Sequence, residues 1–345
     1  MNQLRSSKSD PLLGTITVPG DKSISHRALI MGALSIGESK ISGLLEGEDV
    51  LGTAAALRAM GAEIYKDDDG LWHVHGVGIG GLREPAEPLD MGNSGTGVRL
   101  LMGLVATHPI EVTFTGDHSL SSRPMKRVTD PLSEFGAEFT GNDAGTLPIK
   151  VIGAQSPIPI SYELPVASAQ VKSAVMLAGL NTPGRTTVIE KIPTRDHSER
   201  IFKYFGVPVK IDGDEIHVNG HAELTAQDMA VPADPSSASF LVVSALITEG
   251  SDITIKNVGM NPARTGLFTT LMDMGGAINF ENERQECGED VADIVAEEPV
   301  VDPVVDPVDP AVDPVDPMTD DESDEALLTV DEIASKVNGL KQSRI

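Results

Sequence analysis

Cysteine and long apolar runs are scarce in this chain of 345 residues. Its single cysteine, Cys287, excludes an internal disulfide and a metal cluster of the usual Cys/His spacing. No apolar run approaches the roughly 18 residues that a membrane-spanning helix needs. Residues 1–9 are polar and lack the apolar stretch of a signal peptide. These absences predict a cytoplasmic protein with no metal site and no membrane segment.

Basic residues are absent from one long stretch, which runs from Gln285 to Ser335. Residues 285–345 hold 18 acidic and 3 basic side chains, so they carry −15 of the formal net charge of −26 and leave −11 for residues 1–284. Nucleic-acid binding needs a basic surface, which this charge balance disfavours. We therefore expect no nucleic-acid partner.

The acidic stretch contains a low-complexity repeat, because Val-Asp-Pro occurs five times between Val301 and Pro317. Each proline removes a backbone donor and pushes the preceding aspartate out of the helical region. The sequence therefore predicts a disordered acidic linker over residues 295–326. For residues 327–345 it predicts a short helix, either solvated or docked on an unidentified protein partner. The signals are a capping box at Thr329–Glu332 and the helical spacing of Ile333, Val337 and Leu340.

One order of elements occurs four times before the acidic stretch. Each copy has a loop rich in Pro, Gly or Ser, a helix of small apolar residues, a short β-branched strand, and a charged helix closed by glycine. The closing glycines stand 75, 70 and 69 residues apart, which indicates a repeated supersecondary unit. Such α/β units cover one side of a sheet and stack to bury the other. The glycines are Gly61, Gly136, Gly206 and Gly275, and the expected strands cover 39–42, 111–114, 186–189 and 252–255.

Cations gather at the expected helix starts, although the first 284 residues are acidic overall. Free backbone N–H groups and the helix dipole favour an anion at such positions. Several converging loops of this kind predict a ligand with at least two anionic groups, such as a phosphate and a carboxylate. The residues concerned are Lys22, Ser23 and Arg27; Gly92–Thr96 with Arg99; Arg123, Lys126 and Arg127; Ser168, Ala169 and Gln170; and Arg195.

Segments of these loops, taken in chain order, resemble the 5-enolpyruvylshikimate-3-phosphate (EPSP) synthase family, the 3-phosphoshikimate 1-carboxyvinyltransferases. The resemblance runs from about Leu13 to about Asp293 without large gaps. It is carried by ProGlyAspLysSerIleSerHisArg (19–27), GlyAsnSerGlyThr (92–96) with Arg99, ArgProMet (123–125), AlaSerAlaGlnValLysSerAla (167–174), ThrArgAspHis (194–197), AspProSerSerAlaSer (234–239) and AsnProAlaArgThrGly (261–266).

The resemblance implies the α/β enolpyruvyl transferase fold, in which six repeated βαβαββ-type units form two domains with the active site between them. Four of the six units are recognisable in this chain. We therefore expect a three-unit domain over residues 13–224, and a partial second domain of one unit over 1–12 and 225–294. The implied reaction belongs to the shikimate pathway of aromatic amino acid biosynthesis. It transfers the carboxyvinyl group of phosphoenolpyruvate to shikimate 3-phosphate without a cofactor or metal.

The resemblance also implies roles for individual residues. Lys22 is the implied catalytic residue and contacts both substrates. Asn93, Gly95 and Arg123 lie on the phosphoenolpyruvate side, and some glyphosate-tolerant members of the family carry Ala at the position of Gly95. The implied shikimate 3-phosphate contacts are Lys22, Ser23, Arg27, Ser168, Ala169, Gln170 and Arg195.

The UDP-N-acetylglucosamine enolpyruvyl transferases share the architecture and are the alternative enzyme family. They resemble one another in a Lys-Asn pair where this chain has Lys22–Ser23, and in a loop cysteine where residues 116–122 have none. The shikimate family therefore fits better. Nothing after Asp293 resembles the acid, base and phosphoenolpyruvate-binding residues of units five and six. We expect a C-terminally incomplete site without turnover, and a truncated or rearranged fragment that binds shikimate 3-phosphate or a partner is the non-enzymatic alternative.

Overall fold

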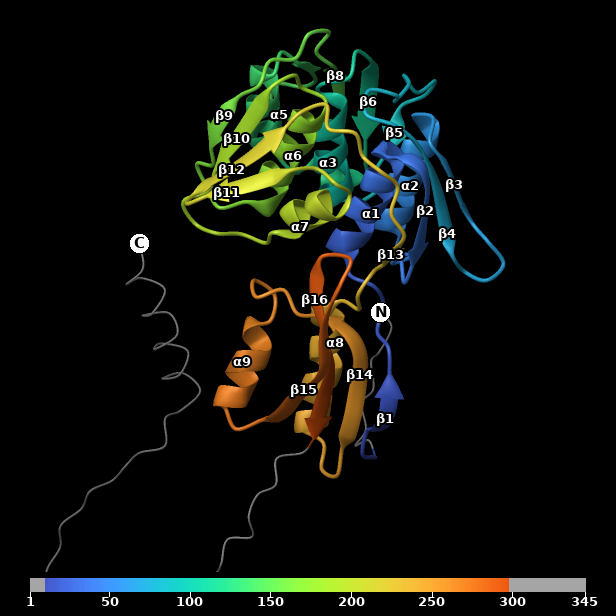
Figure 1. Cartoon of the computed structure of the whole chain (residues 1–345), viewed down its shortest axis with the longest axis vertical. Coiled ribbons are helices and arrows are strands. Elements are labelled where there is room, and N and C mark those ends of the chain that lie inside the picture. Colours follow the sequence, from blue (N-terminus) through green and yellow to red (C-terminus); the bar gives the residue numbers. More distant parts are fainter. Residues whose placement is uncertain (1–9, 298–345) are drawn as a thin grey trace, which may run out of the picture. The chain divides into compact units, whose positions relative to one another are not determined.

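Four sheets of four strands each form the framework of residues 10–297, the part of the chain that this computed structural model describes (Figure 1). In each sheet one pair of neighbouring strands is parallel. The other two pairs are antiparallel. This shared topology confirms the predicted repeat of α/β units. The predicted linker from residue 298 onward and the predicted helix at 327–345 lie outside the described residues.

Each predicted strand lies within the second strand of one sheet, as the β-branched residues at these positions led us to expect. The first sheet is β13 (Met229–Ala230), β2 (Ile36–Ser42), β4 (Trp72–Val77) and β3 (Glu63–Lys66); the second is β5 (Leu89–Asp90), β6 (Glu111–Thr115), β8 (Ile149–Ile152) and β7 (Glu138–Thr140); the third is β9 (Ser161–Glu163), β10 (Arg185–Ile189), β12 (Glu215–Asn219) and β11 (Val209–Asp212); the fourth is β1 (Leu13–Ile16), β14 (Asp252–Gly259), β16 (Glu289–Glu297) and β15 (Ala277–Glu286).

The small apolar helices begin where the sequence predicted, because an Asp or Ser side chain caps each one. The cap accepts a hydrogen bond from a backbone N–H of the first turn, which satisfies a donor that the helix itself leaves unpaired. These caps therefore fix the positions of the loops that precede the helices. The helices are α1 (Lys22–Leu34), α3 (Gly95–Val105), α6 (Ala169–Leu180) and α8 (Pro235–Leu246), with caps Asp21, Ser94, Ser168 and Asp234.

The charged helices end at the predicted glycines, each of which adopts a positive φ. A left-handed residue after the last turn is the usual helix stop, and glycine adopts it without a Cβ clash. The φ angles are +107° at Gly61, +101° at Gly136, +85° at Gly206 and +91° at Gly275. These helices are α2 (Glu48–Ala59), α5 (Lys126–Glu134), α7 (His197–Tyr204) and α9 (Gly266–Asp273), and α4 (His118–Ser121) is an additional short turn.

Helices α3 and α6 approach each other closely at Gly103. A Cβ atom at this position would lie 2.4 Å from the backbone oxygen of Ala174, so only glycine fits there. Helices α1, α3 and α6 belong to one hydrophobic core, whereas α8 belongs to a second core with β14 and β16. Helix α8 is buried on one side only, since Phe240 and Ile247 are each 78% exposed.

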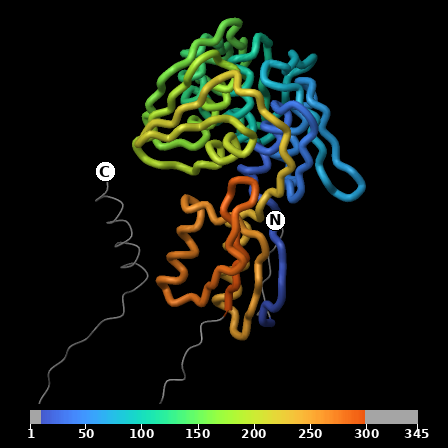
Figure 2. Tube along the Cα trace, in the orientation of Figure 1, coloured from blue at the N-terminus to red at the C-terminus, as the bar shows by residue number. Residues whose placement is uncertain are grey.

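The structure corrects three predicted domain boundaries. Strand β1 pairs in parallel with β14, so residues 13–16 lie in the fourth sheet and not in the three-unit domain. Conversely, β13 pairs with β2 and returns residues 229–230 to the first sheet. Figure 2 shows the blue N-terminal segment beside the orange strands of the fourth sheet. The fourth unit also extends to Glu297, beyond the predicted end at 294, because residues 295–297 pair with β14.

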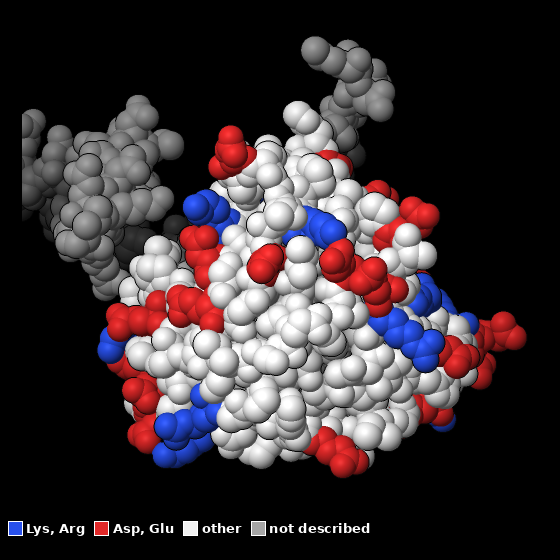
Figure 3. All heavy atoms as spheres, turned by 90° about the horizontal axis from the view of Figure 1, so that it is seen from above, with Lys and Arg blue, Asp and Glu red and all other residues white. Residues whose placement is uncertain are grey.

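No helix within residues 10–297 has both the length and the apolar character to cross a membrane. On the face that Figure 3 shows, Lys and Arg side chains are interspersed with Asp and Glu. The acidic side chains therefore do not form one continuous patch on this face.

Candidate functional site

Three loops that precede separate helices converge on one pocket. Its residues come from the starts of α1, α3 and α6, together with the segment before α7 and the first residue of α7. Five of the predicted shikimate 3-phosphate contacts line it: Ser23, Arg27, Ala169, Gln170 and Arg195. The pocket also contains Thr96 and His197, which the prediction did not assign to this ligand.

The guanidinium of Arg27 is held rigidly at the base of this pocket. Its Nε donates to the Ser198 hydroxyl at 2.8 Å, Nη2 donates to the Ser173 hydroxyl at 2.7 Å, and Nη1 donates to the Ser23 carbonyl at 2.8 Å. Burial lowers the pKa of Arg27 to about 10, with Glu199 and Asp21 opposing the shift. The side chain therefore remains a cation at neutral pH, in a fixed orientation suited to an anionic ligand.

Gln170 connects the pocket to a second group of cations. Its amide oxygen accepts from Arg99 Nη1 at 3.1 Å and from Arg127 Nη2 at 3.4 Å, and its amide nitrogen donates to Thr96 Oγ1 at 3.1 Å. Burial, followed by repulsion from Arg127 and Arg123, lowers the pKa of Arg99 to about 10. The structure thus concentrates positive charge beside Gln170.

The predicted phosphoenolpyruvate side forms its own hydrogen-bonded cluster. Arg123 donates from Nη2 to the Asn93 side-chain oxygen at 2.6 Å and to the Ser119 hydroxyl at 3.1 Å. The amide nitrogen of Asn93 donates to Asp117 at 2.7 Å. A Cβ atom at Gly95 would lie 3.0 Å from Arg123 Nη1, so glycine lets this guanidinium approach the backbone. Asn93, Gly95 and Arg123 are therefore brought together.

Lys22 and Ser168 lie at the starts of α1 and α6 rather than among the residues that line the pocket. Lys22 is exposed and pairs through Nζ with Asp49 Oδ2 at 3.2 Å. Ser168 is the N-cap of α6 and accepts from the Val171 N–H at 3.4 Å. The side chain of Ser168 therefore positions the helix start that presents Ala169 and Gln170.

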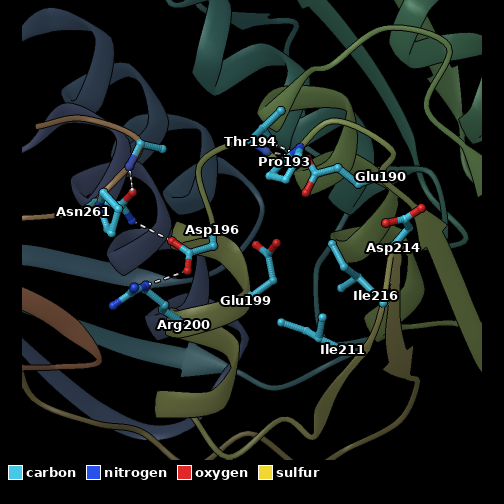
Figure 4. Close-up of a pocket in the computed structure, with 13 residues that line it drawn as sticks. Glu190, Pro193, Thr194, Asp196, Glu199, Arg200, Ile211, Asp214, Ile216 and Asn261 are labelled. Carbon is cyan, nitrogen blue, oxygen red and sulfur yellow. Dashed lines mark hydrogen bonds and ion pairs between the residues drawn. The ribbon is translucent and has the colours of Figure 1, made fainter. Parts of the chain in front are cut away.

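Arg195 lies on a segment that is anchored at both of its neighbours. The hydroxyl and N–H of Thr194 donate to Glu190. Asp196 accepts from Arg200 Nε at 2.8 Å and from Asn261 Nδ2 at 2.6 Å (Figure 4). Within residues 10–297 the guanidinium of Arg195 forms no hydrogen bond. The anchors thus hold a free cation at the pocket wall.

Figure 4 shows these anchors around a larger cavity that the same segment helps to line. Two carboxylates of its lining pair with Lys172, which is fully buried: Glu190 Oε2 at 2.9 Å and Glu199 Oε1 at 2.8 Å. Burial raises the pKa of Glu199, and the Lys172 ammonium opposes that shift. None of the predicted binding residues lines this cavity. The buried ion pair of Lys172 holds Glu190, which in turn accepts from Thr194 and so supports the Arg195 segment.

The residues that sequence reasoning missed support the predicted ones. Ser198 and Ser173 orient Arg27 from 171 and 146 positions away, and Lys172 holds Glu190, which accepts from Thr194. His197 lies in a quoted segment, but its contact with Glu289 spans 92 positions. The helix-start pattern identifies residues at a helix start, but it carries no signal for contacts made over such separations.

Repeated α/β units with an anion-binding pocket at converging helix starts define the class of this protein, and comparisons with known proteins define its family. The sequence model of EPSP synthase (3-phosphoshikimate 1-carboxyvinyltransferase) matches residues 6–317. A 3-phosphoshikimate 1-carboxyvinyltransferase of Novosphingobium aromaticivorans is 62% identical over 299 residues, and the match covers 85% of this chain and 68% of that protein. One of Paramagnetospirillum magneticum is 60% identical over 297 residues, covering 85% and 67% respectively.

Solved structures agree with the sequence comparison. The 2.37 Å structure of EPSP synthase from Acinetobacter baumannii superposes with a TM-score of 0.79 at 46% identity, over 84% of this chain and 66% of that one. The chain therefore belongs to the EPSP synthase family, which confirms the predicted resemblance. It spans about two thirds of the length of the curated relatives that it matches.

Proposed function

We propose that this chain serves carboxyvinyl transfer from phosphoenolpyruvate to shikimate 3-phosphate, the shikimate-pathway step of its family. Its described residues bind shikimate 3-phosphate in the pocket at the starts of α1, α3 and α6. The single observation that carries this proposal is the convergence of Arg27 and Arg195 with Gln170 in one pocket. Two cations and an amide donor on separate helix starts suit a small ligand with two anionic groups.

Phosphoenolpyruvate binds beside this pocket in the proposed arrangement. Asn93, Gly95 and Arg123 form that side, and Arg99 links it to Gln170 by donating both to the Gly95 carbonyl and to the Gln170 amide oxygen. Lys22 contacts both substrates from the first turn of α1, where its exposed ammonium has only Asp49 to exchange for a ligand within the described residues. No metal or organic cofactor takes part in the proposed reaction. A cytoplasmic location agrees with a chain that has one cysteine, because reducing compartments need no disulfides.

Ligand-induced stabilisation tests the proposed specificity. Shikimate 3-phosphate at 100 times its dissociation constant stabilises the folded state by about 2.7 kcal/mol and therefore raises the melting temperature. Glucose 6-phosphate carries a phosphate but no carboxylate, and UDP-N-acetylglucosamine is the ligand of the alternative family. We expect a smaller shift with either compound. An equal shift with all three ligands would contradict recognition of two anionic groups.

Transfer and binding are separated by a second assay. Phosphate release from phosphoenolpyruvate in the presence of shikimate 3-phosphate reports transfer, whereas melting temperature reports binding alone. Binding without phosphate release would agree with the expected incomplete site and leave the chain a ligand-binding role, whereas phosphate release would contradict that expectation.

A further inference from the structure

His197 is the one imidazole among the residues that line the proposed shikimate 3-phosphate pocket within the described part of the chain. It is the first residue of α7, directly after Asp196 and one position from the support residue Ser198. The ring is 3% exposed. Its Nε2 is buried and has no hydrogen-bond partner among residues 10–297. An unpaired nitrogen at this depth needs a partner, because burying a polar group without a hydrogen bond is costly.

The other ring nitrogen has a partner from the fourth unit. His197 Nδ1 lies 2.7 Å from Glu289 Oε1, and Glu289 is itself only 4% exposed. Glu289 begins β16, directly after the turn at Gly288, whose φ is +84°. Arg200 fastens the same turn to α7, since Nη1 donates to the Gly288 carbonyl at 3.2 Å and to Asp290 Oδ2 at 2.9 Å. The Glu289 carboxylate is therefore held against the ring.

This contact determines what Nε2 offers to the pocket. A carboxylate at Nδ1 accepts a hydrogen bond from that nitrogen, so Nε2 is the ring nitrogen left for a ligand. The cations Arg27 and Arg195 line the same pocket and suit an anionic ligand. An imidazole that carries a proton on both nitrogens donates from Nε2–H to such an anion while Nδ1–H stays on Glu289.

We propose that His197 is an additional ligand for an anionic group of shikimate 3-phosphate, with Glu289 of the fourth unit as the residue that positions its ring. This inference rests on the proposed function and deepens it. It makes binding in the three-unit pocket dependent on a carboxylate contributed by β16. Phosphate and carboxylate share the chemistry that His197 recognises, so the experiment must separate the two groups.

Two substitutions of His197 distinguish the roles of its two ring nitrogens. His197→Asn keeps an amide N–H near the position of Nδ1, and so keeps the Glu289 contact, but removes the group that faces the pocket. His197→Gln places a neutral donor near Nε2 and loses the Glu289 contact. Calorimetry on the full chain should show shikimate 3-phosphate binding about 10- to 100-fold weaker for His197→Asn, the range for one charge-assisted hydrogen bond, and a smaller loss for His197→Gln.

The positioning role of Glu289 has its own readouts. Nitrogen-15 spectra of the wild-type complex should show a proton on both ring nitrogens of His197, and Glu289→Gln should change the Nδ1 signal. The double variant His197→Asn/Glu289→Gln should bind no more weakly than His197→Asn alone, because both changes act through one ring. If the affinity losses of the two single variants instead add in the double variant, Glu289 only holds β16 in place and its positioning role is overturned.

A matched control exists in β12. His217 is also buried, with Nδ1 2.9 Å from Thr187 Oγ1 and Nε2 3.4 Å from Glu215, and it is not among the pocket residues. His217→Gln should leave the affinity for shikimate 3-phosphate unchanged.

Shikimate and inorganic phosphate serve as separate probes of the two anionic groups. Weaker binding of shikimate to His197→Asn would show that His197 contacts the carboxylate, and weaker binding of inorganic phosphate would show that it contacts the phosphate. If the wild-type chain binds shikimate 3-phosphate and His197→Asn binds it equally well, the inference is overturned while the proposed function stands. If the wild-type chain does not bind it, the proposed function itself fails.

Discussion

Arg27 and Ser173 lie 146 positions apart in the chain but are joined by a 2.7 Å hydrogen bond from Nη2 to Oγ. This bond ties the first turns of α1 to those of α6 and fixes one edge of the guanidinium. Ser198 accepts from Nε and fixes another edge, so the orientation of the cation is set before a ligand arrives. Preorganisation of this kind reduces the entropy cost of binding.

Arg27→Lys should therefore weaken shikimate 3-phosphate binding although it keeps the charge. A lysine ammonium cannot reproduce the planar fork that reaches Ser173 and Ser198 together. We expect affinity to fall about 10- to 100-fold, equivalent to about 1.4–2.7 kcal/mol, in calorimetric titrations. Ser198→Ala keeps the cation and removes one support, so its loss should be smaller. Wild-type affinity in Arg27→Lys would show that charge alone is recognised.

Helix packing predicts opposite effects for two glycine-to-alanine substitutions. Gly103→Ala places a methyl group 2.4 Å from the Ala174 oxygen and forces α3 away from α6, so the free energy of unfolding should fall by about 1–3 kcal/mol. Gly52 lies inside α2, where an added methyl group would meet no neighbouring atom within 4 Å. Gly52→Ala should therefore raise the free energy of unfolding by about 0.5–1 kcal/mol. Urea unfolding measures both. If both substitutions change the free energy of unfolding equally, the close approach of α3 and α6 at Gly103 does not affect stability.

The buried ring of His26 predicts a specific loss of stability in acid. Burial, and then the Arg27 charge, lowers the pKa of His26 from 6.5 to about 3 in the folded chain. The unfolded chain binds this proton below pH 6.5 while the folded chain does not until about pH 3, so the free energy of unfolding decreases as the pH falls through this window. The slope contributed by one group reaches about 1.4 kcal/mol per pH unit.

His26→Asn should flatten that slope, because asparagine does not titrate while its amide still reaches toward Thr53, which contacts His26 Nδ1 at 2.8 Å. Unfolding free energies at pH 7.5, 6.5 and 5.5 provide the comparison. Parallel pH profiles for the wild-type chain and the variant would mean that His26 has the same pKa in the folded and unfolded states, which would contradict this prediction.

The local elements were predictable from sequence because short-range chemistry sets them. Asp21 and Ser94 mark helix starts through their own cap bonds, and Gly61 marks a helix end through its positive φ. Strand β1 was assigned to the wrong domain, since its four residues give no indication of which sheet edge they will join. Its partner β14 lies more than 230 positions further along the chain, and only the folded structure shows the pairing.

The same distinction applies to the candidate site. Ser23, Arg27, Gln170 and Arg195 belong to loop motifs that can be recognised one at a time, and the structure brings them into one pocket. Thr96 lies in such a motif too, but its contact with Gln170 depends on how α3 packs against α6. The contact of Glu289 with His197 requires the fourth unit to meet α7, and no local pattern encodes that meeting.

Calorimetric titration of the chain of 345 residues with shikimate 3-phosphate tests the central claim most directly. The account predicts one binding site, and predicts that Arg195→Ala and Lys22→Ala each weaken it by about 1.5–3 kcal/mol, or roughly 10- to 100-fold. Lys191→Ala is the matched control, because its exposed ammonium pairs only with Asp214 at 3.4 Å within the described residues, and it should leave the affinity unchanged. Wild-type affinity in both Arg195→Ala and Lys22→Ala would contradict the account.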